Sequence, residues 1–321
     1  MQLKQADAAR VGDQRASIAA AAPRRRGLSD RVRLSIGAER RLGLLFILPA
    51  LLLLFLILGF PAVAAILQSF SLAWVDQPAF SLGSYARMIS DEDFRVALIN
   101  TTVFVAIVVC FHMALGLAVA LLLNLDIWAK WLFRVVALLP WTMPDVIGGL
   151  VWRFLFDTLP GAVNSVLLRV GAIATPVDWL SQPNYAFATL VLAESWRGYP
   201  FVMLVLLAGL QTIPASQYEA AAIDGAGSWQ SFVHVTFPNL RPMFVIALVL
   251  DTIWQCRLFG MVYSLTGGGP GDSTNTLSLL TFKNYFVYFN TSYAAAIAVV
   301  LALIMLLISS PYLRMTMKER S

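Results

Sequence analysis

Ionisable, amide and aromatic side chains interrupt two long apolar stretches of the sequence. They are Glu194 and Arg197, followed by Gly198, in one stretch and Asp251, Trp254 and Gln255 in the other. Within each stretch the spacing of three and four residues puts the side chains on one face of a helix. Carboxylates and amides hydrogen-bond sugar hydroxyls, and aromatic rings stack on the apolar face of a sugar. Charged groups at membrane depth face water or each other, so the two sets predict a path for a polar solute.

The same charges allow a purely structural interpretation, which stays open at this point. Glu194 and Arg197 stand at i, i+3 and can neutralise each other within one helix. Asp251 can pair with Arg197 or with Arg257. Either arrangement would satisfy the charges without any contact to solute.

Three further ionisable residues fall in or next to apolar stretches. Asp145 follows Pro144 and either lines a cavity or caps a broken helix. Arg153 is expected to extend toward the outer interface of a membrane. His112 is expected to be a packing residue that is hydrogen-bonded to a neighbour.

The composition indicates an all-α polytopic membrane protein. The chain has 321 residues, of which 59% are hydrophobic and 13% charged, too apolar for a soluble domain. Its long apolar runs predict about six membrane helices. We place them at about 42–67, 96–125, 133–156, 185–210, 243–263 and 293–313. Cys110 and Cys256 lie inside apolar runs, so we expect no disulfide, metal or cofactor.

Charge bias predicts the orientation of these helices. Residues 1–41 form a basic segment that we interpret as a disordered cytoplasmic tail, ahead of a membrane domain at 42–321. Its basic residues and those near the C-terminus satisfy the positive-inside rule, which puts both termini in the cytoplasm. The acidic segment 69–95, residues 157–183 and the glycine-rich turn 266–271 then lie outside. Leu115 to Ala118 offers a small-residue face for close helix packing.

The loop at about 211–242 has more structure than a simple connector needs. Glu219 to Ile223 is alanine-rich and predicts a short helix. Gly225 and Gly227 allow a sharp turn, and a second helix is expected at about 228–237, closed by Pro238 and Pro242. A helix, a glycine turn and a second helix outside the bilayer are typical of a docking element for a soluble partner.

The order of residues in this loop resembles the signature loop of bacterial ABC importer permeases. The residues that carry the resemblance are Glu219, Ala220, Ala221, Asp224, Gly225, Ala226 and Pro238. Segments at 133–152, 207–219 and 265–276 are similar to the carbohydrate-importing subgroup, so the resemblance covers about 95–300. Cys256 and Gly260 depart from the subgroup, which commonly has an aromatic and an acidic residue there.

The resemblance implies a complex in the bacterial inner membrane. Its other members would be a second permease subunit, two cytoplasmic ATP-binding subunits and an extracytoplasmic solute-binding protein. Glu219 would form an ion pair with the ATPase, and Gly225 would set the angle between the two loop helices. The resemblance also places the solute site on the spans that carry Glu194 and Asp251.

The function expected from these observations is the import of a sugar or sugar-like solute. An alternative with the same architecture is the import of an anionic solute such as a phosphorylated polyol, held by Arg197 and Arg257. The sequence has no zinc-protease or serine-hydrolase motif and no nucleotide-binding glycine-rich loop, so we expect a partner to hydrolyse ATP. A channel or secondary transporter would not need the docking loop.

Overall fold

A computed structural model describes residues 45–72, 79–159 and 161–318, with side chains up to residue 310. The described ranges contain helices and turns but no strand, as expected for an all-α chain. Residues 45–54 are helical, followed by η1 (Phe55–Gly59), α3 (Phe60–Ser69), α4 (Gly83–Ser90), α5 (Glu92–Asn124), α6 (Lys130–Thr142), α7 (Asp145–Leu155), α8 (Ala162–Arg169), α9 (Pro183–Leu210), α10 (Ala215–Ile223), α11 (Ser228–Ser231), η2 (Phe232–Thr236), α12 (Phe237–Cys256), α13 (Gly260–Leu265), α14 (Leu277–Phe282), η3 (Lys283–Val287) and α15 (Thr291–Lys318).

The chain divides into two compact units, Met1–Ala62 and Val63–Ser321. The predicted tail at 1–41 lies outside the described residues. Residues 45–62 of the first unit are helical and apolar.

Five described helices are long and apolar enough to cross a membrane, and a bent pair supplies a sixth. The five are Leu45–Ser69, Glu92–Asn124, Pro183–Leu210, Ser228–Cys256 and Thr291–Ser310. The bent pair is α6 and α7, which meet at an angle of 94°. Pro144 explains the bend, because a proline disfavours helical geometry in the residue before it, and Met143 is extended. The first half of the pair begins at Lys130, a few residues before the predicted start of the span at about 133.

The central pair of the second unit is α5 and α9, which pack along much of their length. Gly116 of α5 lies against Val202 and Met203 of α9, where a β-carbon would collide with both. The small-residue face predicted at Leu115–Ala118 therefore does allow two helix backbones to approach closely. α12 packs against both central helices, so residues from all three can meet in the interior.

The prediction that Pro238 and Pro242 close the second loop helix was wrong. Helical structure continues from Ser228 through both prolines to Cys256. A wide π-helical turn, η2, precedes Pro238, and Phe237 N–H donates to Phe232 O, five residues back. Such a turn accommodates a residue that has no N–H and whose ring would clash with the carbonyl four residues earlier.

The fifth span ends earlier than predicted. We expected it to continue to Tyr263, but α12 ends at Cys256, and the short helix α13 follows after a break. The segment 157–183, which we expected outside, contains the short helix α8. Residues 281–287, which follow the glycine-rich turn, lie in α14 and η3.

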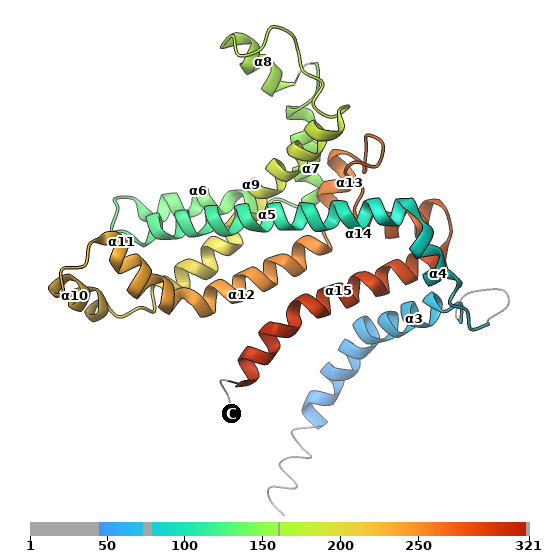
Figure 1. Cartoon of the computed structure of the whole chain (residues 1–321), viewed down its shortest axis with the longest axis horizontal. Helices are drawn as coiled ribbons and strands as arrows, with labels where there is room; N and C mark the ends of the chain where they lie inside the picture. The colour runs from blue at the N-terminus through green and yellow to red at the C-terminus, as the bar shows by residue number, and fades with distance from the viewer. Residues whose placement is uncertain (1–44, 73–78, 160, 319–321) are drawn as a thin grey trace, which may run out of the picture. The chain divides into compact units, whose positions relative to one another are not determined.

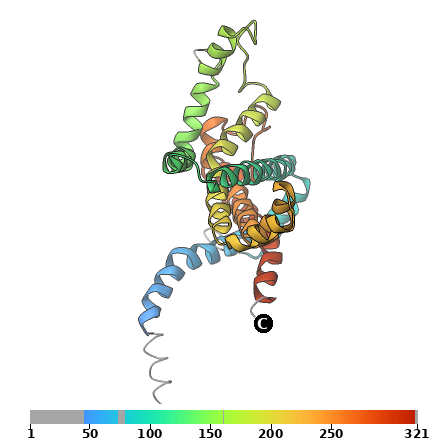
Figure 2. The same cartoon turned by 90° about the vertical axis from the view of Figure 1, so that its left-hand side faces the viewer.

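Two groups of connecting segments lie at opposite ends of α5 (Figure 1). The α10–α11 segment lies at one end, and Figure 2 views that end directly. α4 and α14 lie at the other end of α5, where Asn100 bonds to the turn that follows α13. The loop with the signature residues and the glycine-rich turn are therefore on opposite sides of this unit, as expected when a single span, the one that contains α12, separates them in the chain.

Candidate functional site

A polar cavity of about 450 Å³ lies among α6, α7, α9 and α12. Its lining residues are Trp141, Asp145, Arg197, Gly198, Asp251, Trp254, Gln255, Arg257 and Leu258. Five of the six predicted path residues are among them. The sixth, Glu194, is fully buried and does not line the cavity. The faces of α9 and α12 that helical spacing predicted do meet around this one cavity.

Arg197 is held by two carboxylates from different helices. Its Nε donates to Glu194 Oε2 at 2.9 Å and its Nη2 donates to Glu194 Oε1 at 2.6 Å. Its Nη1 lies 2.9 Å from Asp145 Oδ1 on α7. The intrahelical pair left open by the sequence is therefore present, and Asp145 takes part in an ion pair while also lining the cavity. Fork-shaped contacts of this kind fix a guanidinium in one orientation.

Asp251 pairs with neither of the two arginines that we considered. Its carboxylate instead accepts from His112 of α5, with Nδ1 at 2.9 Å from Oδ2 and 3.1 Å from Oδ1. The other ring nitrogen of His112, Nε2, lies 3.0 Å from the backbone oxygen of Glu194. His112 is fully buried and joins α5 to α9 and α12. Its hydrogen bonding was expected, but its partnership with Asp251 was not.

Gln255 leaves an acceptor free next to the cavity. Its Nε2 lies 3.4 Å from Asp251 Oδ1, a long contact. Its Oε1 is buried and has no hydrogen-bond partner among the described residues. A buried amide oxygen without a partner costs free energy, about 1–3 kcal/mol for a typical polar group. A hydrogen-bond donor that enters the cavity and bonds to this oxygen would therefore remove that free-energy cost.

Three aromatic rings form one wall beside these polar groups. The Phe201 and Trp254 rings have centroids 4.5 Å apart, and the Trp141 and Phe201 rings 6.4 Å apart. The side chains of Trp141 and Trp254 line the cavity. The arrangement offers flat apolar surface next to hydrogen-bonding groups, which suits the two kinds of surface on a sugar ring.

Arg257 is the other cation at the cavity. It follows the last residue of α12, and no ion pair holds it within the described part of the chain. Arg153 is exposed on α7 and does not line this cavity.

The predicted docking loop forms a shallow groove at the opposite end of the unit from α14. The groove is lined by Gln217, Ala220, Ala221, Asp224, Ala226, Gln230, His234 and Val235. Gly225 takes the left-handed conformation with φ of 79°, and Gly227 is the N-cap of α11. Glu219 is exposed beside the groove, and Pro238 lies in the first turn of α12.

Two large apolar side chains stand out from this loop. Ile223 is 85% exposed and Trp229 is 74% exposed. Hydrogen bonds from Tyr218 to Thr236 and from Asn239 to Gln217 tie α10 to the helix that leads into the membrane. The loop is thus braced against α12 while it presents apolar and acidic groups to its surroundings.

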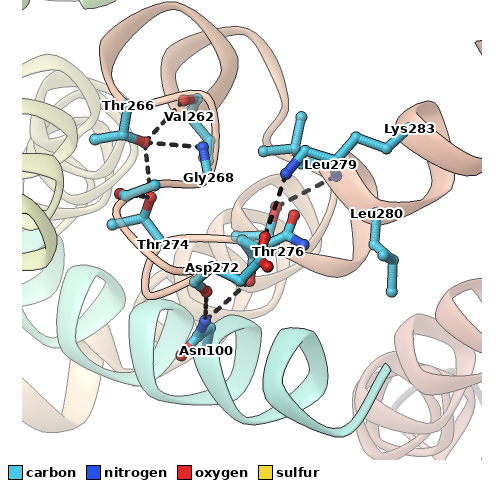
Figure 3. A network of polar contacts seen from close by, with 12 residues as sticks. Asn100, Val262, Thr266, Gly268, Asp272, Thr274, Thr276, Leu279, Leu280 and Lys283 are labelled. Atoms are coloured by element: carbon cyan, nitrogen blue, oxygen red, sulfur yellow. Dashed lines mark hydrogen bonds and ion pairs between the residues drawn. The ribbon is translucent and has the colours of Figure 1, made fainter. Parts of the chain in front are cut away.

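The glycine-rich turn after α13 is fastened by side chains (Figure 3). Asn100 Nδ2 donates to the carbonyls of Asp272 and Asn275, at 2.9 and 3.1 Å. Lys283 Nζ pairs with Asp272 Oδ1 at 3.3 Å. The Thr266 and Thr274 hydroxyls lie 2.7 Å apart. The turn is therefore attached both to α5 and to η3.

Comparisons with known proteins find similarity to permease components of transport systems. The family model described as "Binding-protein-dependent transport system inner membrane component" matches residues 112–315. The sulfoquinovosyl glycerol transport system permease protein of Agrobacterium fabrum is 38% identical over 280 residues, covering 86% of this chain and 90% of the relative. The trehalose/maltose transport system permease protein of Thermococcus litoralis is 36% identical, covering 86% and 94%.

A solved structure supports the fold independently. The structure of a bacterial ABC transporter that imports alginate contains a chain with a TM-score of 0.76 and 22% identity, covering 89% of this chain and 99% of that one. The family match takes in α9, the signature loop and α12, which together hold most of the cavity and the whole groove. This chain belongs to the family of inner-membrane permease components of binding-protein-dependent ABC transport systems.

Proposed function

We propose that this permease imports a sugar or glycoside and that the cavity between α9 and α12 is part of the solute path. The observation that carries the proposal is the unpartnered Gln255 Oε1 next to the Asp251 carboxylate and the Trp254 ring. Two sugar hydroxyls can donate, one to Gln255 Oε1 and one to the Asp251 carboxylate, while the sugar ring stacks on the aromatic side chain. The relatives that transport sulfoquinovosyl glycerol and trehalose or maltose support this solute class.

An anionic solute is the second candidate, and the ion pairs of Arg197 change which residue could bind it. Arg197 directs all three guanidinium nitrogens to Glu194 and Asp145, so little of its charge is available to a solute. Arg257 is then the cation that would recognise an anionic group. The anionic alternative therefore requires Arg257 and not Arg197.

The groove at α10 and α11 is the proposed docking site for a cytoplasmic ATPase. Exposed Ile223 and Trp229 supply apolar contacts, and Glu219 and Asp224 supply charges that a basic partner surface can meet. In this arrangement both termini are cytoplasmic, and a second permease and two ATPase subunits complete the importer. The turn at 266–276 then faces the solute-binding protein.

The test is uptake of radiolabelled trehalose, maltose, lactose and glycerol glycosides by cells that express the complete importer. Trp254→Ala and Gln255→Leu should each lower uptake about tenfold, while Trp254→Phe, which keeps a ring, retains most of it. Thr102→Val is the matched control, because Thr102 lies on α5 and does not line the cavity. Uptake that Trp254→Ala and Gln255→Leu leave unchanged would exclude this path.

Arg257→Gln separates the two solute classes. Neutral sugars should still enter at close to the normal rate, whereas an anionic solute should lose at least about tenfold in uptake because its charge partner is gone. Strong inhibition of neutral sugar uptake by this substitution would argue for a structural role of Arg257 instead.

A further inference from the structure

His112 is a fully buried titratable group that neither the predicted path nor the docking loop accounts for. The chain contains two histidines, and the other, His234, lies in the groove at the signature loop. His112 sits in the middle of α5, where its ring contacts both α9 and α12. A buried imidazole in an apolar helix needs a partner for each polar atom.

The partner of Nε2 fixes one proton. Nε2 lies 3.0 Å from the Glu194 backbone oxygen. A carbonyl oxygen accepts hydrogen bonds and cannot donate them, so Nε2 carries a hydrogen.

The partner of Nδ1 fixes a second proton. Nδ1 lies 2.9 and 3.1 Å from the two oxygens of Asp251, so it faces the carboxylate almost symmetrically. Gln255 Nε2 also approaches Oδ1, so that oxygen accepts and carries no proton. In its ionised form Asp251 accepts through Oδ2 as well, which requires a donor at Nδ1. Both ring nitrogens of His112 therefore donate, as in an imidazolium.

The fold makes room for this ring at one position. A β-carbon on Gly198 would collide with three atoms of the His112 ring. Gly198 also lines the cavity, so the ring stands directly behind the cavity wall. The glycine thus permits a close approach between α9 and the side chain that holds Asp251.

We propose that His112 is a positioning residue of the solute path, a buried imidazolium that holds the Asp251 carboxylate at the cavity wall and neutralises its charge. This inference rests on the proposed function of the cavity. With His112 charged, the cations His112, Arg197 and Arg257 balance the carboxylates of Asp145, Glu194 and Asp251. A balanced cavity suits a neutral polyhydroxylated solute, because it provides acceptors without attracting ions.

The protonation state is tested by nitrogen NMR of the purified, complete importer with [15N]histidine incorporated. His112→Gln and His234→Gln importers identify the two signals of this chain by difference from the wild type. The His112 signal should show a directly bonded proton on both ring nitrogens. A bare ring nitrogen at His112 would overturn the assignment, whatever solute the importer carries.

The positioning role is tested by a double-mutant cycle on sugar uptake. Asp251→Asn and His112→Gln should each reduce uptake about tenfold or more, and the double variant should be no worse than Asp251→Asn, because His112 acts through Asp251. Thr102→Val on the same helix should transport normally. Additive losses in the double variant, or a loss explained wholly by less assembled importer, would overturn the positioning role.

The two proposals fail in different ways. If Trp254→Ala and Gln255→Leu leave uptake intact, the cavity is not the solute path, and His112 has no solute path to serve. If those variants lose uptake but His112→Gln does not, the path stands and the role of His112 is refuted.

Discussion

Arg197 of α9 and Asp145 of α7 are 2.9 Å apart at Nη1 and Oδ1, and this ion pair joins the second half of the broken span to the central helix pair. The two partners differ in exposure, since the Asp145 side chain is 44% exposed and that of Arg197 is 12% exposed. Behind Arg197 stands Glu194, which is fully buried. Arg197 therefore pairs with one partly exposed carboxylate and one fully buried carboxylate.

This difference predicts unequal effects of substitution. Arg197→Gln leaves the buried Glu194 without a cation and should destabilise the protein by about 3–5 kcal/mol. Asp145→Asn removes a partly hydrated partner and should cost about 0–1 kcal/mol. The measurement is the thermal unfolding of the purified importer. Glu194→Gln combined with Arg197→Gln should recover part of the loss, and equal losses for the two single variants would contradict this account.

Gly198 predicts a steric effect that depends on His112. Gly198→Ala places a methyl group in the His112 ring, so it should displace the ring from Asp251 and lower both stability and uptake. His112→Ala by itself should also lower stability, because it leaves the buried Asp251 carboxylate without its partner. In the His112→Ala background the obstacle is absent, so Gly198→Ala should cost little further thermal stability. Uptake should stay low in the double variant, because Asp251 still lacks its partner. A stability loss from Gly198→Ala that is as large with His112→Ala as without it would show that the collision lies elsewhere.

The loop glycines offer a matched pair. A β-carbon would meet open space at both Gly225 and Gly227, but only Gly225 has a positive φ, at 79°, whereas Gly227 has φ of −70°. Gly225→Ala should therefore strain the turn by about 1–2 kcal/mol, and Gly227→Ala should not. We expect Gly225→Ala, and more strongly Gly225→Asp, to reduce substrate-stimulated ATP hydrolysis by the importer. Full stimulation in the Gly225→Asp importer would refute a hinge at this residue.

Much of the site could be predicted because ionisable groups inside apolar spans are rare and costly. That rule selected Glu194, Arg197 and Asp251, and helical spacing added Gln255 to the face of Asp251. Of these residues, Arg197, Asp251 and Gln255 line the cavity. The partner of Asp251 could not be predicted in this way. His112 lies 139 residues away on a different helix, and spacing along one helix does not say which helix packs beside it.

The helix ends were less predictable than the helices. Pro238 and Pro242 are ordinary stop signals, yet a π-helical turn lets the helix continue through them. Asn100 shows the same limit for turns, since its side chain fastens a turn about 170 residues further along the chain. In both cases the local sequence gives the propensity, and distant packing decides the outcome.

Asn100 predicts how firmly the turn at 266–276 is held. Its Nδ2 supplies both hydrogen bonds to the carbonyls of Asp272 and Asn275, so Asn100→Asp replaces a double donor with a charged acceptor facing two carbonyls. Amide hydrogen exchange across 266–277 should become at least about tenfold faster, including at Leu277, whose N–H donates to the neighbouring Thr101. Thr102→Val, two residues further along α5 and outside this network of hydrogen bonds, should leave exchange unchanged. If Asn100→Asp also leaves it unchanged, the pair of Lys283 with Asp272 and the threonine contacts hold the turn by themselves.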